Sequence, residues 1–138
     1  MRKIPQVRSR GWIQGESMFH HVQISVSDFT RSLRFWRAAL EPLGYVAQSV
    51  DEAGQSAGFG AAGAPRLWIG VGTPSKGPVH LAFEAKDAAA VSKFHAAALA
   101  AGGKDNGAPG PRPGYGPTYW AAFVIDPDGN NVEAVLAT

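Results

Sequence analysis

The sequence predicts an α+β fold built from two similar βαβββ modules. The main observation is an internal repeat: "HVQISVSDFTRSLRFWRAALEPLG" (21–44) and "HLAFEAKDAAAVSKFHAAALAAG" (80–102) share His, Asp and Phe at seven-residue intervals. The two copies begin 59 residues apart, and each ends in an Ala/Leu-rich run followed by glycine. In each copy, residues that alternate between apolar and polar precede residues with helical periodicity, which predicts a strand followed by a helix.

The ends of both predicted helices carry typical signals. Apolar residues alternate over 22–26 and over 81–85, as in strands with one buried face. Asp28 and Asp87 follow these strands, where an N-cap residue satisfies the free N–H groups of a helix. Phe35 and Trp36 are expected in the core. Glycines suited to a left-handed residue end both helical patterns: Gly44 and Gly102.

Shorter apolar segments after each helix predict the remaining strands. They lie around Val46 and Phe59, and over 67–71, 119–125 and 132–136. The turn Asp126-Pro127-Asp128-Gly129 predicts a hairpin between the last two strands. The segment "GGKDNGAPGPRPGYGPT" (102–118) is so rich in Gly and Pro that we expect an irregular loop.

Length and composition indicate one globular domain. The chain has 138 residues, of which 45% are hydrophobic, and this suffices for a single core. We expect residues 1–17 to be a flexible leader or tag and residues 18–138 to be the domain, with modules at about 18–73 and 78–138. The leader carries four of the 13 basic and one of the 11 acidic side chains, which leaves nine basic and ten acidic ones in the domain. This balance argues against a nucleic-acid partner.

The sequence predicts a cytoplasmic protein with no membrane partner. No apolar run approaches the roughly 18 residues of a membrane-spanning helix, and residues 1–17 lack the apolar core of a secretory signal. The chain has no cysteine, so a metal ion would have to be bound by His, Asp or Glu.

The stretch "GQSAGFGAAG" (54–63) matches two catalytic motifs that its surroundings do not support. Residues 54–58 match the nucleophile motif G-x-S-x-G, and residues 58–63 match the dinucleotide-binding motif G-x-G-x-x-G. Both motifs require a helix directly afterwards, whereas Pro65 and the strand-like "RLWIGVG" follow here. We interpret these glycines as part of a hairpin turn.

Three residues combine metal-ligand chemistry with a shared strand face. His21 and His80 occupy equivalent positions in the repeat, opposite the apolar residues that face the helix. Glu133 alternates with the apolar residues of the final strand. Two imidazoles and a carboxylate on the inner face of a curved sheet would form a 2-His-1-carboxylate site with open positions for water and substrate. The alternative is that both histidines are structural and that Glu133 faces solvent.

The combination of "HHVQISVSD…SLRFWRAALEPLGY", "HLAFEAKD…F" and "FVIDPDGNNVEAV" over residues 18–138 resembles the vicinal oxygen chelate superfamily. This superfamily includes glyoxalase I, bleomycin-resistance proteins, fosfomycin-resistance transferases and extradiol dioxygenases. The resemblance implies that the two modules form a cup-shaped mixed sheet, commonly in a homodimer with exchanged modules; the alternative is that the two modules close within one chain. It also implies that His21, His80 and Glu133 bind a divalent metal ion (Fe, Mn, Ni or Zn), which acts as a Lewis acid on a small substrate with vicinal oxygens.

One position departs from the pattern of glyoxalase I. Those enzymes use a fourth ligand, usually Glu or Gln, in the last strand of the first module, and aligning the two repeats puts Trp68 at or beside this position. The departure favours a three-ligand site, as in the dioxygenases or fosfomycin transferases. We therefore expect a metal-dependent lyase or dioxygenase. The alternative is a metal-free binding protein similar to bleomycin-resistance proteins, which characteristically lack the ligand set.

Three aromatic residues are candidates for contact with a substrate. Tyr119 would be catalytic if its strand parity is that of the inner face, because its phenol could donate a proton or a hydrogen bond to a bound oxyanion. Trp68 shares the parity of Glu133 in the repeat, so its indole could stack on a substrate. Tyr115 and Arg112, in the Gly/Pro-rich segment, could close over an anionic substrate. Core packing for Tyr119 and simple exposure for Tyr115 are the alternatives.

Overall fold

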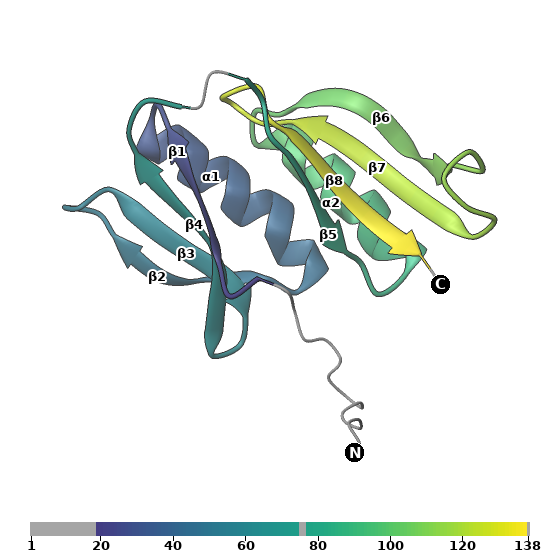
Figure 1. The fold of residues 1–138 in the computed structure, drawn as a ribbon, viewed down its shortest axis with the longest axis horizontal. Helices are drawn as coiled ribbons and strands as arrows, with labels where there is room; N and C mark the ends of the chain where they lie inside the picture. Colours follow the sequence, from purple (N-terminus) through teal and green to yellow (C-terminus); the bar gives the residue numbers. More distant parts are fainter. Residues whose placement is uncertain (1–18, 75–76, 138) are drawn as a thin grey trace, which may run out of the picture.

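A computed structural model describes residues 19–74 and 77–137, which form the two predicted βαβββ modules (Figure 1). The predicted leader at 1–17 lies outside the described residues. The first module contains β1 (Val22–Val26), α1 (Phe29–Leu40), a 3-10 turn η1 (Glu41–Leu43), β2 (Val46–Asp51), β3 (Ser56–Ala61) and β4 (Ala64–Val71). The second contains β5 (His80–Glu84), α2 (Ala88–Ala100), β6 (Lys104–Pro111), β7 (Tyr119–Ile125) and β8 (Asn131–Ala137). Among the described helices, none is long and apolar enough to cross a membrane.

Each module forms its own four-stranded mixed sheet. The strand orders are β1-β4-β3-β2 and β5-β8-β7-β6, so that β1 and β5 are edge strands. Both sheets pair their first and last strands in parallel and in the same register: Gln23 lies opposite Trp68, and Ala82 lies opposite Glu133. The repeat therefore extends to the strand pairing and confirms the α+β class. Within the described residues, one chain contains two separate sheets.

The predicted helix ends are confirmed. The Asp28 side chain accepts a hydrogen bond from the backbone N–H of Arg31 at 2.9 Å, and the Asp87 side chain accepts one from Ala90 at 2.8 Å. These bonds satisfy N–H groups that have no partner inside the helix. The glycines after the two helices have left-handed φ angles of 91° at Gly44 and 104° at Gly102.

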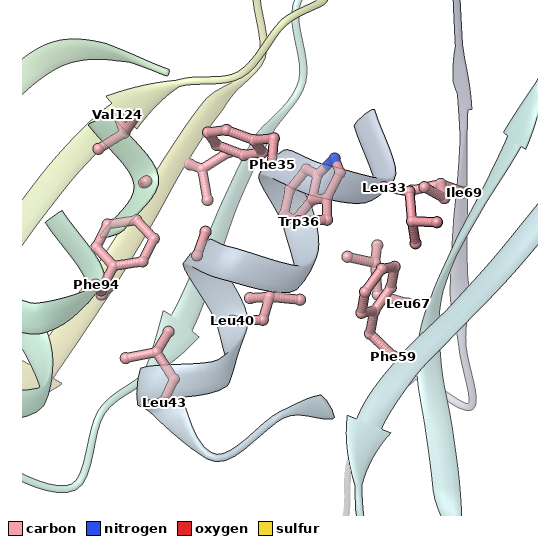
Figure 2. Packing of buried hydrophobic residues seen from close by; sticks show 14 of the residues in the cluster. Leu33, Phe35, Trp36, Leu40, Leu43, Phe59, Leu67, Ile69, Phe94 and Val124 are labelled. Carbon is pink, nitrogen blue, oxygen red and sulfur yellow. The ribbon is translucent and has the colours of Figure 1, made fainter. Parts of the chain in front are cut away.

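The hydrophobic core extends from the first sheet through α1 and α2 to the second sheet. Figure 2 shows α1 with residues of β3 and β4 on one side and residues of the second module on the other. Phe35 and Trp36 are fully buried, as predicted. Other buried members of the cluster are Leu33, Leu40, Phe59, Leu67, Ile69, Phe94 and Val124. Because the helices cover one face of each sheet, the opposite faces remain for other contacts.

One segment differs from the prediction. Residues 104–111 form β6 at the edge of the second sheet and pair with β7, although the Gly/Pro-rich segment 102–118 was expected to be an irregular loop. The register shifts on both sides of Gly107, whose φ of 152° is accessible to glycine. Prolines 109 and 111 are tolerated because one side of an edge strand makes no ladder hydrogen bonds.

The stretch 54–63 forms strand β3 with a turn on either side, so only some of the glycines interpreted as a hairpin turn lie in turns. Ser56 begins β3, and Gly63 has a φ of 82° in the turn between β3 and β4. A strand follows instead of the helix that a nucleophile elbow or a dinucleotide-binding loop requires. Both catalytic motifs are therefore excluded.

Candidate functional site

His80 and Glu133 are in contact on the face of the second sheet that points away from α2. His80 begins β5, and Glu133 lies in the neighbouring strand β8, opposite Ala82. The distance from His80 Nε2 to Glu133 Oε1 is 2.9 Å. The Glu133 side chain is 3% exposed and that of His80 is 49% exposed. A buried carboxylate therefore contacts an imidazole that solvent can reach.

The hydrogen bonds of His80 indicate which ring nitrogen is available. Its Nδ1 lies 3.1 Å from the backbone carbonyl oxygen of Asn131, an atom that can only accept. We infer that Nδ1 carries the proton and donates it, which leaves the lone pair of Nε2 directed at Glu133. A lone pair that faces a carboxylate oxygen requires a proton or a cation between the two atoms. The pair thus supplies two ligand atoms of the kinds that divalent transition metals prefer.

Tyr119 hydrogen-bonds the second oxygen of Glu133. Its phenol, on β7, donates to Glu133 Oε2 at 2.5 Å. This hydrogen bond, together with desolvation and the negative charge of the carboxylate, raises the pKa of Tyr119 to about 12. The phenol therefore remains protonated and able to donate at neutral pH. The structure places Tyr119 on the inner face, which was the condition for its predicted role, and its catalytic role stays a prediction.

An aromatic layer supports the His80 ring. Phe123 stacks on His80 with ring centres 6.2 Å apart and an interplanar angle of 22°. The Arg112 guanidinium lies 5.4 Å from the centre of the Phe123 ring. Arg112 also donates to the carbonyl oxygens of Ala108 at 2.7 Å and Gly110 at 3.0 Å. Arg112 thus links the edge strand β6 to Phe123 on β7, on the sheet face that carries the site.

Phe123 and Asn131 were not identified from the sequence as site residues. Phe123 lies opposite Glu133 in the pairing of β7 with β8. Asn131 contributes a backbone carbonyl, which every residue type has. The signal that could have found both residues is the pairing register of β5, β7 and β8.

Tyr115 lies at the rim of this site. Its side chain is 68% exposed, and its ring contacts that of Tyr119 edge-on, with centres 5.3 Å apart. A ligand that reaches the Tyr119 phenol would therefore pass close to Tyr115. Its role in substrate binding stays a prediction.

The turn between β7 and β8 positions the two strands that carry His80 and Glu133, which are β5 and β8. Asp126 is buried, and its carboxylate accepts hydrogen bonds from the backbone N–H groups of Asp128 and Asn130. Asn130 in turn accepts a hydrogen bond from the backbone N–H of Val79 at 3.0 Å, directly before His80. The burial of Asp126 raises the pKa of its carboxyl group. The turn therefore connects the start of β8 to the start of β5.

His21 does not join His80 and Glu133 within one chain. His21 is exposed on the first module, and its Nδ1 lies 2.9 Å from Nδ1 of His20. Among residues 19–74 and 77–137, no group of three His, Asp or Glu side chains is close enough to hold a metal ion. One chain therefore brings together two of the three predicted ligands.

Trp68 has the same place in the first sheet that Glu133 has in the second. It lies opposite Gln23 on β1 and Gly58 on β3, as Glu133 lies opposite Ala82 on β5 and Phe123 on β7. The alignment of the two repeats therefore agrees with the strand register, and the role of Trp68 in substrate binding stays a prediction. The indole is partly exposed on the face that α1 does not cover.

A groove of about 730 Å³ separates β5 from the first module. Apolar side chains line most of it, and His80 is one of its lining residues. Its lining includes Val22, Leu40, Tyr45, Phe59 and Phe83. The groove leaves the edge of β5 accessible to solvent.

Comparisons with known proteins agree with this architecture. The family model of the glyoxalase/bleomycin resistance protein/dioxygenase superfamily matches residues 18–134. A glyoxalase/bleomycin resistance protein from Albidiferax ferrireducens T118 is 29% identical with a TM-score of 0.74, over 88% of this chain and 100% of that chain. Glyoxalase I from Zea mays, as its V278E mutant, is 30% identical with a TM-score of 0.59, over 83% of this chain and 44% of that chain.

A third solved structure shares the fold at lower identity. The fosfomycin resistance protein FosX from Mesorhizobium loti is 20% identical with a TM-score of 0.63, over 91% of this chain and 93% of that chain. A comparison with curated proteins gives no match.

Proposed function

The chain belongs to the glyoxalase/bleomycin resistance protein/dioxygenase superfamily, and from this premise we propose that it is a divalent-metal-dependent lyase or dioxygenase acting on a small substrate with vicinal oxygens. The contact between His80 Nε2 and Glu133 Oε1 carries the proposal. An imidazole nitrogen and a carboxylate oxygen meet there, and they suit Fe, Mn, Ni or Zn. The exposure of His80 gives a ligand access to this point.

We assign the third ligand position to His21 of a second copy of the chain. His21 directly precedes β1, as His80 begins β5, and both strands are sheet edges. Edge strands have unpaired N–H and C=O groups that another chain can pair with. In a symmetric dimer in which β1 of each copy meets β5 of the other, two equivalent sites of His21, His80 and Glu133 would form.

The residues around the ligands have distinct proposed roles. A bound metal ion would supply Lewis-acid chemistry by polarising the oxygens of the substrate. The Asn131 carbonyl holds the His80 ring in one tautomer and orientation. The phenol of Tyr119 has one proton, which it donates to Glu133 Oε2 in the free protein; when substrate binds, the phenol would turn this hydrogen bond to the substrate oxygen that gains negative charge. Phe123 covers one face of the His80 ring.

Metal content after loading and removal of free metal tests the proposal. His21→Ala and His80→Ala should each lose most of the metal that the wild-type protein retains. His95→Ala is the matched control, because His95 lies on α2 and contacts Asp105 instead of the site. Undiminished metal in His80→Ala would contradict the metal site.

Mixing the two variants tests whether copies share the site. After dissociation and reassociation of an equimolar mixture, half of the dimers contain one copy of each variant, and each of these has one intact site. Metal content should therefore return to roughly a quarter of the wild-type value. Loss in both single variants without restoration in the mixture would exclude the exchanged arrangement. Sedimentation of the wild-type protein gives the oligomeric state independently.

A metal-free ligand-binding protein is the second candidate function. It is favoured by the absence of a third ligand beside His80 and Glu133 within the described part of one chain. In this case the loaded wild-type protein would retain no metal but would bind an aromatic cationic drug tightly. Stoichiometric metal in the wild-type protein would exclude it.

A further inference from the structure

Trp68 lies flat on the backbone of Gly58. A Cβ atom added to Gly58 would be 2.9 Å from each of three indole carbons, Cε2, Cζ2 and Cη2. These carbons are consecutive in the six-membered ring, and a point equally close to all three lies over the ring face and not beyond its edge. One face of the indole therefore covers the buried Gly58, and the other face points away from the sheet.

The surroundings leave this outer face open. Trp36 and Trp120 belong to or pack against the hydrophobic core, whereas Trp68 takes no part in it. The neighbours of Trp68 across the sheet are Gly58, which has no side chain, and the exposed Gln23. Among the described residues, no aromatic ring is paired with the indole of Trp68.

A polar side chain borders the indole. The amide nitrogen of Gln23 lies 3.5 Å from the position of a Cβ atom at Gly70, so the amide reaches across to β4 beside Trp68. A ring stacked on Trp68 would thus lie close to the side-chain amide of Gln23.

We propose that the outer face of Trp68 is a stacking site for a planar aromatic ring with a polar edge. This inference rests on the proposed function, for which it names the substrate class. Aromatic rings interact favourably in offset stacks, and this term adds to the burial of apolar area. A saturated molecule of the same size would bury a similar apolar area on binding but could not stack on the indole. The flat indole therefore favours planar rings. Gly58 is required, because any side chain there would lift the indole from the sheet.

The test is binding of 2-naphthol and of decahydro-2-naphthol, its saturated analogue, to the full chain. Calorimetry gives the affinity, and the indole N–H resonance of Trp68 reports the location. We expect 2-naphthol to shift this resonance and to bind roughly tenfold more tightly than the analogue. Trp68→Ala should weaken 2-naphthol binding roughly tenfold, and Trp68→Phe should retain most of it.

Further variants separate stacking from a general loss of structure. Gly58→Ala keeps the indole but displaces it, so it should also weaken 2-naphthol binding. Val50→Ala is the control, because it shortens an exposed apolar side chain on β2 of the same sheet and should leave the affinity unchanged. Equal affinity in Trp68→Ala, or for the saturated analogue, would overturn the inference. If Trp68→Ala does not fold, the inference is tested by the affinities of Trp68→Phe and Gly58→Ala for 2-naphthol and by the wild-type preference for 2-naphthol over its saturated analogue.

Metal content measured in the same samples distinguishes this inference from the proposed function. Metal-loaded protein that does not bind 2-naphthol would reject the aromatic site alone. Binding of 2-naphthol that depends on Trp68, in protein that retains no metal after loading, would reject the metal-dependent enzyme and leave the aromatic site standing.

Discussion

Asp126→Ala should destabilise the turn between β7 and β8. This turn connects β8, which carries Glu133, to β5, which carries His80. The Asp126 side chain is 4% exposed and accepts hydrogen bonds from the N–H of Asp128 (2.9 Å), the N–H of Asn130 (2.7 Å) and the side-chain amide of Asn130 (3.0 Å). Alanine leaves three donors without this acceptor. Two of them belong to Asn130, which is 6% exposed and cannot readily turn to water.

The expected loss of stability follows from these three hydrogen bonds. Each hydrogen bond to a charged group contributes about 1.5–3 kcal/mol. Burial raises the pKa of Asp126, which shows that the folded protein disfavours the charged form, and alanine relieves this cost. We therefore expect the free energy of unfolding to fall by about 3 kcal/mol, with a decrease in Tm of about 10 °C. Because Asn130 also holds Val79, variants that still fold should bind less metal.

Urea denaturation followed by circular dichroism measures the effect of Asp126→Ala. Asp128→Ala is the control from the same turn. Its carboxylate accepts hydrogen bonds from the Ser27 hydroxyl at 2.6 Å and the Ser27 N–H at 3.2 Å, both among exposed groups, so we expect a loss of about 1 kcal/mol. A smaller loss in Asp126→Ala than in Asp128→Ala would refute the reasoning.

Three further variants test single features. Tyr119→Phe should remove a phenol that titrates well above the ordinary value of about 10, seen as the difference between the ultraviolet titrations of the wild-type protein and the variant; a difference centred near pH 10 would contradict the hydrogen bond to Glu133. Gln55→Gly should raise the free energy of unfolding by about 0.5 kcal/mol, because Gln55 has a left-handed φ of 55°; a lower urea midpoint would contradict this. Hydrogen bonds from His95 and from the N–H of Gly107 lower the pKa of Asp105, so its contribution to stability is complete above about pH 4 and is lost as the pH falls through the lowered pKa. Asp105→Asn should therefore weaken the acid dependence of stability, and an unaltered dependence below about pH 4 would speak against this contribution.

The elements that could be predicted from the sequence are those that depend on local signals. Asp28 and Asp87 cap their helices because a short side chain can reach an N–H group three residues ahead. The same signals occur twice in the chain, which identified the modules. β6 could not be predicted, because its Gly/Pro-rich segment becomes a strand only by pairing with β7.

The candidate site could be predicted only in part, because strand parity is a local signal whereas strand pairing and module packing are not. Strand parity placed His80 and Glu133 on one face and left the face of Tyr119 open, and the structure brings these three side chains into contact. Parity cannot reveal which carbonyl orients His80, because this depends on the pairing register. The separation of His21 from His80 depends on how the modules pack through α1 and α2, and no local pattern encodes that packing.

Trp68→Glu tests whether the uncovered faces of the two sheets meet at one site in the proposed dimer. The parallel registers are the same in both sheets, so a carboxylate at position 68 would be related to His21 as Glu133 is to His80. It would add a further oxygen ligand, and we expect metal affinity, measured by competition with a chelator, to increase about tenfold.

Trp68→Leu is the control for this variant, because it removes the indole without adding a ligand. Tighter metal binding in Trp68→Glu but not in Trp68→Leu would mean that the first sheet forms one wall of the metal site, so that a ring stacked on Trp68 lies within reach of the metal. Equal affinity in both variants would place the indole outside the metal site. A stacked aromatic ring would then be held at a separate position on the first sheet.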